Sequence, residues 1–271
     1  MSDIMTCMPF GQLMEWVLQE KSGKDTVFGV HRPYTINADH NLTIFERNLE
    51  TPVGPAAGPH TQLAQNIIAS YYAGARFFEL KTVQKMDGAE LSACVNKPCI
   101  LADDEGYNCE WSTELTVPDA MSEYIKAWFI LHVIAKEFGL GAQDGFQFNI
   151  SVGYDLAGIK GEKVNTFIDG MMEAKDTVIF QECRKWLLDN ADKFQNFTRE
   201  DIEAIPSNVC NSATISTLHG CPPQEIESIA NHLFKEKHLN TFIKCNPTLL
   251  GYEYARKTMD DMGYDYIAFG D

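Results

Sequence analysis

The fold is decided by the stretch Thr241-Phe242-Ile243-Lys244-Cys245-Asn246-Pro247-Thr248. Its apolar and β-branched start predicts a short buried strand, and polar side chains follow where that strand ends. The same pattern, an apolar run that leads into a cluster of candidate functional residues, recurs at residues 51–56, 76–83, 146–152, 213–218 and 266–271. A helical pattern follows each predicted strand except the last. The sequence therefore predicts an α/β fold of the (β/α)8 TIM-barrel type, with chemistry at the carboxyl ends of the strands.

The length and composition are those of a globular α/β domain. The chain has 271 residues, of which 45% are hydrophobic and 11% aromatic. A chain of this length can bury one large core, and α/β barrels often use it as a single domain. We expect residues 1–50 to form an N-terminal extension and residues 51–271 to form the barrel domain. Residues 27–47 could be a hairpin that covers the bottom of the barrel.

The net charge excludes some classes of partner. At pH 7 the formal charge is −16, which argues against a protein that binds nucleic-acid phosphates or an acidic membrane surface. The sequence has no apolar run of about 20 residues and no basic start typical of a signal peptide. We therefore expect a cytoplasmic protein with a small-molecule substrate, and neither nucleic acid nor membrane as a partner.

The eight cysteines are scattered along the chain without C-x-x-C pairs, so a disulfide framework is not expected. Three of them, Cys94, Cys99 and Cys109, lie in one predicted loop. Their spacing matches no iron–sulfur pattern. We interpret them as buried or free thiols and expect no metal site, although three thiols in one loop keep that alternative open.

Small residues and a lysine follow the first two predicted strands. The first ends in Ala56-Ala57-Gly58, where the absence of bulky side chains lets a flat ligand approach the backbone. A tight turn explains the same residues. The second ends in Lys81-Thr82, and a lysine is costly inside a barrel unless it is paired or functional. It suggests contact with an anion or a ring, and a solvated lysine at the rim is the alternative.

Two further strand ends carry candidate groups. Asn149 can both donate and accept hydrogen bonds, which suits the edge of a heterocyclic ring, and a satisfied core Asn is equally plausible. The next strand ends in His219-Gly220-Cys221-Pro222, just before a predicted helix. The positive end of a helix dipole favours a thiolate, so Cys221 is a candidate for proton transfer, with His219 beside it. A free cysteine is otherwise often an inert small hydrophobic residue.

These strand ends resemble the FMN site of dihydroorotate dehydrogenases and of the pyrimidine-reducing barrel of dihydropyrimidine dehydrogenase. The segments that carry the resemblance are Ala56-Ala57-Gly58, Lys81-Thr82, Asn149-Ile150-Ser151, Cys221-Pro222 and Ile243-Lys244. The sequences of residues 79–83 and 217–223 resemble even more closely the N-terminal domain of the selenate reductase YgfK-subunit family. The likeness covers nearly the whole chain from Thr51 onward, although each motif is short.

The resemblance implies a role for each matching residue. Ala56, Ala57 and Gly58 would lie along the flavin, with Thr82 at the same site. Lys81 and Lys244 would stand near its N1–O2 edge, where positive charge stabilises the anionic reduced flavin. Asn149 would bond the ring or the ribityl chain.

The catalytic and substrate roles follow from the same resemblance. Cys221 would exchange the proton while the flavin transfers hydride, which reduces a conjugated, pyrimidine-like substrate. Asn108, in the long loop before residue 118, and Asn246 would contact that substrate. The family has Asn-Leu-Ser where this chain has Leu218-His219-Gly220, so an amide contact is missing or replaced by His219.

The resemblance also predicts further modules and leaves alternatives open. The related larger proteins carry FAD and iron–sulfur modules, so electrons would come from such a module in a longer polypeptide or a partner chain. An eight-stranded barrel needs about two strands more than the six predicted here, so we expect an incomplete barrel. The alternatives are an aldolase-type barrel with a Schiff base on Lys81 or Lys244, and a non-catalytic scaffold in a redox complex. Nothing in these residues selects a selenium oxyanion.

Overall fold

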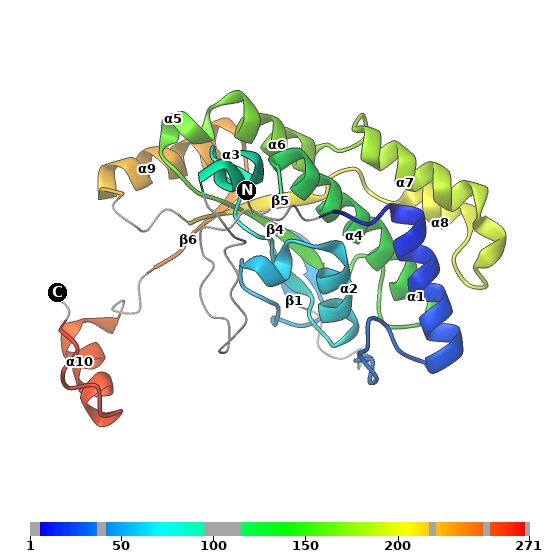
Figure 1. Cartoon of the computed structure of the whole chain (residues 1–271), viewed down its shortest axis with the longest axis horizontal. Helices are drawn as coiled ribbons and strands as arrows, with labels where there is room; N and C mark the ends of the chain where they lie inside the picture. Colours follow the sequence, from blue (N-terminus) through cyan, green and yellow to red (C-terminus); the bar gives the residue numbers. More distant parts are fainter. Residues whose placement is uncertain (1–5, 37–41, 95–114, 217–220, 246–249, 269–271) are drawn as a thin grey trace.

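A computed structural model describes residues 6–36, 42–94, 115–216, 221–245 and 250–268 of the chain (Figure 1). Its strands are β1 (Leu42–Ile44), β2 (Arg47–Leu49), β3 (Phe77–Glu79), β4 (Gln147–Val152), β5 (Cys210–Ile215) and β6 (Asn240–Ile243). The α-helices are α1 (Phe10–Lys24), α2 (Ala64–Tyr72), α3 (Gly88–Cys94), α4 (Val117–Glu137), α5 (Leu156–Ile159), α6 (Glu162–Met172), α7 (Val178–Asp189), α8 (Arg199–Ala204), α9 (Pro223–Asn231) and α10 (Tyr252–Asp261). Short 3-10 helices lie at Pro59–Thr61 and Ala191–Lys193, and a π-helical turn at His232–Glu236 follows α9.

The central feature is a parallel sheet with the strand order β3-β4-β5-β6. Helices lie in every connection between these strands, as the predicted β/α series requires. The register pairs Phe78 with Phe148 and Thr214 with Phe242. Because side chains alternate between the two faces of a strand, these pairs also fix which residues share a face.

The sheet is curved, so that its two outer strands meet on the inner face. The rings of Phe77 in β3 and Phe242 in β6 lie 5.9 Å apart between centroids, although two strands separate them in the sheet. At the carboxyl end, Lys244 reaches Glu79 at 3.3 Å. A flat sheet would hold its first and fourth strands about 14 Å apart, three strand spacings. The sheet is therefore bent like the wall of a barrel.

The predicted strand boundaries were right in some places and wrong in others. Residues 51–56 lie extended beside β3, where the carbonyls of Val53 and Pro55 accept hydrogen bonds from Arg76, Phe77 and Glu79. They do not form a regular strand, since a proline has no N–H to continue the ladder. The strand predicted at 76–83 is regular only over β3, and β5 begins three residues before the predicted 213.

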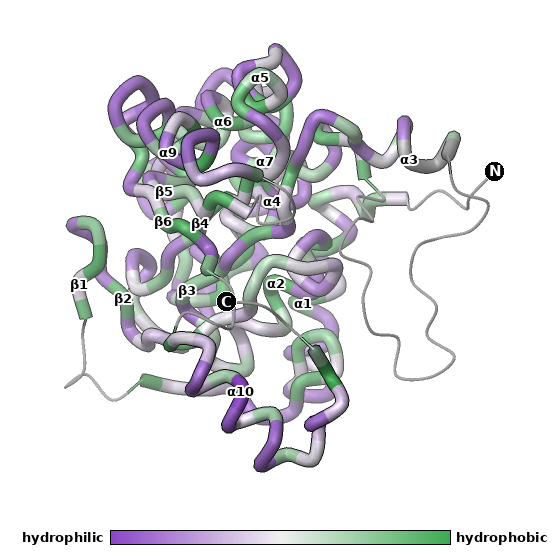
Figure 2. The backbone as a smooth tube through the Cα atoms, turned by 90° about the vertical axis from the view of Figure 1, so that its left-hand side faces the viewer, coloured by the Kyte–Doolittle hydropathy of each residue, from purple (hydrophilic) through white to green (hydrophobic). Residues whose placement is uncertain are grey.

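The sixth predicted strand, 266–271, is not found in its described part, residues 266–268. Helix α10 and the residues after it lie apart from the sheet (Figure 1) and bury no side chain. Figure 2 shows α10 mostly in hydrophilic colours. A strand needs a neighbour for its backbone groups, and this segment lies beside none.

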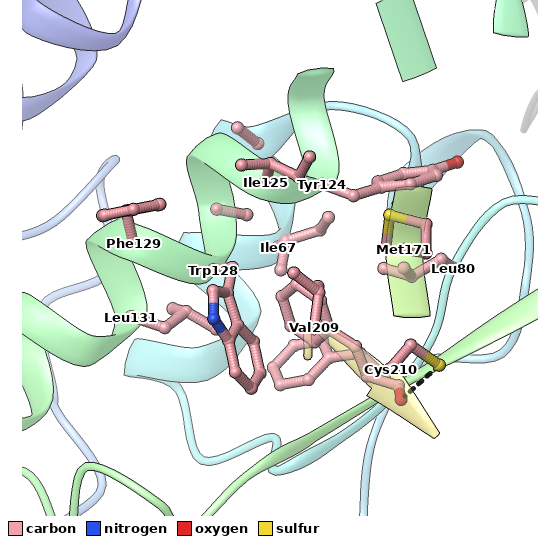
Figure 3. Packing of buried hydrophobic residues seen from close by; sticks show 14 of the residues in the cluster. Ile67, Leu80, Tyr124, Ile125, Trp128, Phe129, Leu131, Met171, Val209 and Cys210 are labelled. Atoms are coloured by element: carbon pink, nitrogen blue, oxygen red, sulfur yellow. Dashed lines mark hydrogen bonds between the residues drawn. The ribbon is translucent and has the colours of Figure 1, made fainter. Parts of the chain in front are cut away.

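The outer face of the sheet packs on helices and holds the core. Phe78, Phe148 and Ile150 are fully buried there, and the ring of Phe148 lies 5.4 Å from that of Trp128 in α4. Figure 3 shows part of the buried core, with Tyr124 and Trp128 of α4 and Met171 of α6 among its labelled residues. Helices α1 and α7 cover α4 in turn, as the ring contacts of Phe129 with Phe10 and Phe180 show. No described helix, including the apolar α4, is both long enough and apolar enough to span a membrane.

The amino ends of the strands are closed by the antiparallel hairpin β1–β2. The side-chain amide of Gln147, the first residue of β4, donates to the carbonyls of Ile44, Arg47 and Asn48 at 3.0–3.3 Å. Asn211 of β5 donates to the carbonyl of Phe45 at 3.1 Å. The hairpin thus covers the bottom of the barrel. The division of the chain at residue 50 stays a prediction.

Candidate functional site

Five chain segments end at the same edge of the curved sheet. They are the loop 56–58, the residues after β3, the second half of β4, the end of β5 and the residues after β6. We call this edge the mouth and define it by Ala57, Glu79, Lys81, Thr82, Asn149, Ser151, Thr214 and Lys244. Carboxyl ends of parallel strands are where α/β barrels carry their active sites.

The loop 56–58 lies against β3 because the chain before it passes unusually close to that strand. A Cβ at Gly54 would come within 1.4 Å of the carbonyl oxygen of Phe77, so only glycine fits there. The backbone N–H of Ala57 then donates to Glu79 Oε2 at 3.1 Å. Ala56 is exposed, whereas Ala57 and Gly58 are half-buried. Ala57 thus lies at the carboxyl end of β3, with Ala56 and Gly58 on either side of it in the chain.

Glu79 links three of the five segments. It is the last residue of β3 and faces inward, with its side chain 14% exposed. One carboxylate oxygen accepts from Ala57 and the other lies 3.3 Å from Lys244 Nζ. Lys244, which follows β6, is 37% exposed. The ion pair therefore ties the loop, the first strand of the sheet and the last one together.

Lys81 and Thr82 continue the chain beyond β3. Lys81 is buried, with 5% of its surface exposed. Its carbonyl accepts a 2.9 Å hydrogen bond from the hydroxyl of Tyr124, and burial raises the pKa of that phenol well above its ordinary value. Thr82 Oγ1 lies 2.7 Å from Ser151 Oγ at the end of β4. These bonds fix the backbone from which both side chains start.

Asn149 lies inside β4 and faces the inner side of the sheet. Its amide nitrogen donates to Thr214 Oγ1 of β5 at 2.7 Å. Its Oδ1 is buried and has no hydrogen-bond partner. A buried acceptor without a partner costs free energy, so this oxygen is set up for a donor that approaches from the mouth. Deeper on the same face, Gln147 Oε1 and Ser212 Oγ are also buried without partners.

The remaining candidates are placed less completely. Cys221 is half-buried, packs against the core and directly precedes Pro222, the N-cap of α9. Its position at the start of a helix after β5 agrees with the sequence interpretation. His219, Asn108 and Asn246 lie outside the described residues. So do Cys99 and Cys109, while within the described ranges no group of three His, Cys, Asp or Glu residues could hold a metal ion.

The residues at the described mouth are of the chemical kinds that a flavin site uses. The mouth offers small residues on one side, two lysines from different segments, and an unpartnered amide oxygen. The sequence interpretation gave no role to Glu79, Ser151 or Thr214, although residues 79–83 and 149–151 carry the resemblance. The alternation of side chains along β3 was the available signal, because it puts Glu79 on the same face as Phe77, opposite to the core residue Phe78.

Described cavities lie elsewhere on the molecule. One of about 470 Å³ lies between residues 51–55 and α2, on the outer side of the open edge. Another of about 240 Å³ lies at the bottom, lined among others by Arg47, Trp128 and His132. We place the candidate site at the mouth because the convergence of charged and unpartnered groups there, unlike these cavities, matches the predicted strand ends.

Comparison with known proteins gives one family. The family described as "Oxidoreductase YgfK, N-terminal TIM-barrel domain" matches residues 28–271. Proteins of Escherichia coli K12 and of E. coli O157:H7, both provisionally named oxidoreductase YgfK, are each 44% identical over 98% of this chain. The alignment spans 27% of the length of those relatives. No solved structure was found to match the chain.

Proposed function

Because this chain belongs to the family of YgfK N-terminal TIM-barrel domains, we propose that it is the FMN-binding module of an oxidoreductase. One observation carries the proposal. Groups from segments up to 187 residues apart, the backbone N–H of Ala57 and the side chain of Lys244, meet on Glu79 at the carboxyl edge of one curved parallel sheet. The mouth contains two lysines, and beside them lies a buried acceptor without a partner. An apolar barrel core would require none of these groups.

The residues would divide the binding of the cofactor between them. Ala56, Ala57 and Gly58 would border the flat ring, since they have little or no side-chain bulk. Lys81 and Lys244 would place positive charge at the edge that becomes negative on reduction. Asn149 Oδ1 would accept a hydrogen bond from the ring or the ribityl chain, and Thr82 would line the same side. FMN, when bound, would supply hydride transfer to a conjugated, pyrimidine-like substrate.

Cys221 would hold and release the proton of the reaction at its Sγ atom. A general acid or base must come within hydrogen-bonding reach of the substrate, and Cys221 directly precedes the N-cap of the helix that follows β5. His219 would assist Cys221, and Asn108 and Asn246 would orient the substrate.

The electron donor lies beyond this chain. The relatives are much longer than the matched region, which supports a donor module with FAD or iron–sulfur clusters in the same polypeptide or a partner chain. We also propose a cytoplasmic location. The described cysteines Cys7, Cys183, Cys210, Cys221 and Cys245 are free thiols, as is usual in a reducing compartment.

The test is a titration of the purified chain with FMN, followed by the change in flavin fluorescence and absorbance. We expect stoichiometric binding, and about tenfold weaker binding for Lys244→Ala, which removes one charge contact of roughly 1.4 kcal/mol. Lys185→Ala is the matched control, since Lys185 pairs with Asp189 on the exposed face of α7. Equal affinity of Lys244→Ala and the unaltered chain would contradict the assigned role.

The same preparation distinguishes the alternatives. An aldolase-type barrel would bind no flavin and would form a borohydride-trapped adduct on Lys81 or Lys244 when mixed with a carbonyl compound. Mass spectrometry would locate that adduct. A scaffold would give neither flavin binding nor an adduct. Either result would overturn the proposed function.

A further inference from the structure

Glu79 is a charged group at the mouth that the proposed function does not use. Its side chain is 14% exposed, although an unpaired carboxylate is costly to bury. It is held by two donors, Ala57 N–H at 3.1 Å and Lys244 Nζ at 3.3 Å. Both donors belong to residues that the proposed function assigns to the cofactor. The carboxylate therefore lies next to the place where the flavin would develop negative charge.

The contacts of Glu79 have two effects on Lys244. The first is geometric, because an ion pair restricts where a long and partly exposed lysine side chain can lie. The second is electrostatic, because a negative charge 3.3 Å from Lys244 Nζ cancels part of the field of that ammonium group. The register pairs Glu79 with Asn149, so the neighbour of Glu79 on β4 is neutral.

We infer that Glu79 is a positioning residue that fixes Lys244 and the Ala57 backbone and lowers the reduction potential of the bound flavin. The inference rests on the proposed function. A carboxylate near the flavin disfavours the anionic reduced form relative to the oxidised form. The module would then hold a flavin that gives up its electrons more readily than the two lysines alone would allow.

The experiment measures the reduction potential of FMN bound to Glu79→Gln, to Glu79→Asp and to the unaltered chain. Glutamine keeps an acceptor for Ala57 N–H but has no charge. We expect Glu79→Gln to favour reduced over oxidised FMN by about tenfold, which for a two-electron couple is a rise of roughly 30 mV. Glu79→Asp keeps the charge and should stay close to the unaltered value.

Glu236→Gln is the matched control. Glu236 also pairs with a lysine, Lys160 at 3.0 Å, but on the exposed side of the molecule. It should leave both affinity and potential unchanged. Glu79→Gln could instead weaken the binding of oxidised and reduced FMN equally and leave the reduction potential unchanged. In that case the role of Glu79 is only structural and the electrostatic inference is wrong.

A second measurement does not depend on flavin. Lys244 should react severalfold faster with an amine-acylating reagent in Glu79→Gln than in the unaltered chain, because its partner has lost its charge. Peptide mapping would identify the modified lysine. Equal rates would overturn the positioning of Lys244 by Glu79. Failure of the unaltered chain to bind FMN would instead overturn the proposed function, so the two failures are distinguishable.

Discussion

The two ends of the curved sheet are built on opposite principles. At the bottom, the hairpin β1–β2 covers the strands, and the guanidinium of Arg76 is fully buried against the carboxylate of Glu50 at 2.8 Å. At the mouth, the ion pair of Glu79 with Lys244 is only partly buried, and Asn149 Oδ1 has no partner. The bottom buries its ion pair almost completely, whereas the mouth leaves its ion pair partly exposed.

This difference between the two ends suggests that the bottom serves stability and the mouth serves binding. In TIM barrels the bottom face serves stability, and loops at the top face carry chemistry. Substitutions at the bottom of this chain should therefore lower the free energy of unfolding, whereas substitutions at the mouth should change flavin binding or turnover at nearly constant stability. The four predictions below test this separation, from the largest expected effect to the smallest.

The largest effect is expected for Arg76→Met at the bottom. Arg76 also donates to the carbonyls of Tyr71 and Leu140. Its loss leaves the Glu50 carboxylate buried without its cation, and breaking such a pair costs about 3–5 kcal/mol. Urea unfolding followed by circular dichroism measures this loss. Lys185→Met, in an exposed pair, should change stability by less than about 0.5 kcal/mol. A loss below about 1 kcal/mol in Arg76→Met would refute the assigned role of the bottom.

The second prediction concerns Cys221→Ala, just before α9. Flavin should stay bound, and reoxidation of the reduced flavin by uracil, followed anaerobically, should slow about a hundredfold, the lower range for a lost general acid. That corresponds to about 2.7 kcal/mol in the barrier. Cys245→Ala removes an exposed thiol after β6 and should have no such effect. An unchanged rate in Cys221→Ala would exclude the proton role.

The third prediction concerns the pH dependence of the free energy of unfolding, to which His132 at the bottom contributes. His132 is buried between aromatic rings, and burial, helped by the charge of Arg47, lowers its pKa from 6.5 to about 3. Between these values the unfolded chain binds a proton that the folded chain does not, so stability falls as the pH falls. The free energy of unfolding then falls by up to about 1.4 kcal/mol for each pH unit.

His132→Phe should remove this contribution. Unfolding of the variant, measured from pH 7 to pH 4, should depend less steeply on pH than that of the unaltered chain. Parallel curves would show that His132 does not titrate as described. Flavin affinity should be the same in both, because His132 lies at the bottom.

The smallest effect is expected for Tyr124→Phe, which connects the core to the mouth. The variant loses the hydrogen bond from the hydroxyl to the carbonyl of Lys81, worth about 1 kcal/mol of stability. Because that bond fixes the backbone of Lys81, flavin affinity should also fall, but less than in Lys244→Ala. Tyr266→Phe is the control, since Tyr266 is 76% exposed. An unchanged free energy of unfolding would show that this bond does not stabilise the fold.

The sequence predicted the helices and most strand positions because their patterns are local. The caps of α4 and α8, Thr116 and Thr198, are bonded as such sequences require. The helical spacing of Ile226, Ile229, Leu233 and Phe234 predicts one apolar face for α9, but Phe234 is 60% exposed. The π-helical turn at His232–Glu236 changes the helical register there, so that His232 is buried instead.

The candidate site was predictable only in its outline. The strand ends named the segments that converge, but no local pattern shows which side chains meet across the barrel. Glu79 and Lys244 are 165 residues apart in the chain, and their contact depends on the curvature of the sheet. For the same reason the sequence placed Asn149 correctly on β4 but gave no sign that its oxygen lacks a partner.

The tie between Glu79 and Lys244 also has a consequence for the order of folding. Contacts between residues so distant in sequence form late, since most of the chain must be arranged first. The helices and the hairpin can fold from local contacts while the mouth is still unassembled. During synthesis on the ribosome, the cofactor would therefore meet a competent pocket only after β6 has emerged and joined the sheet.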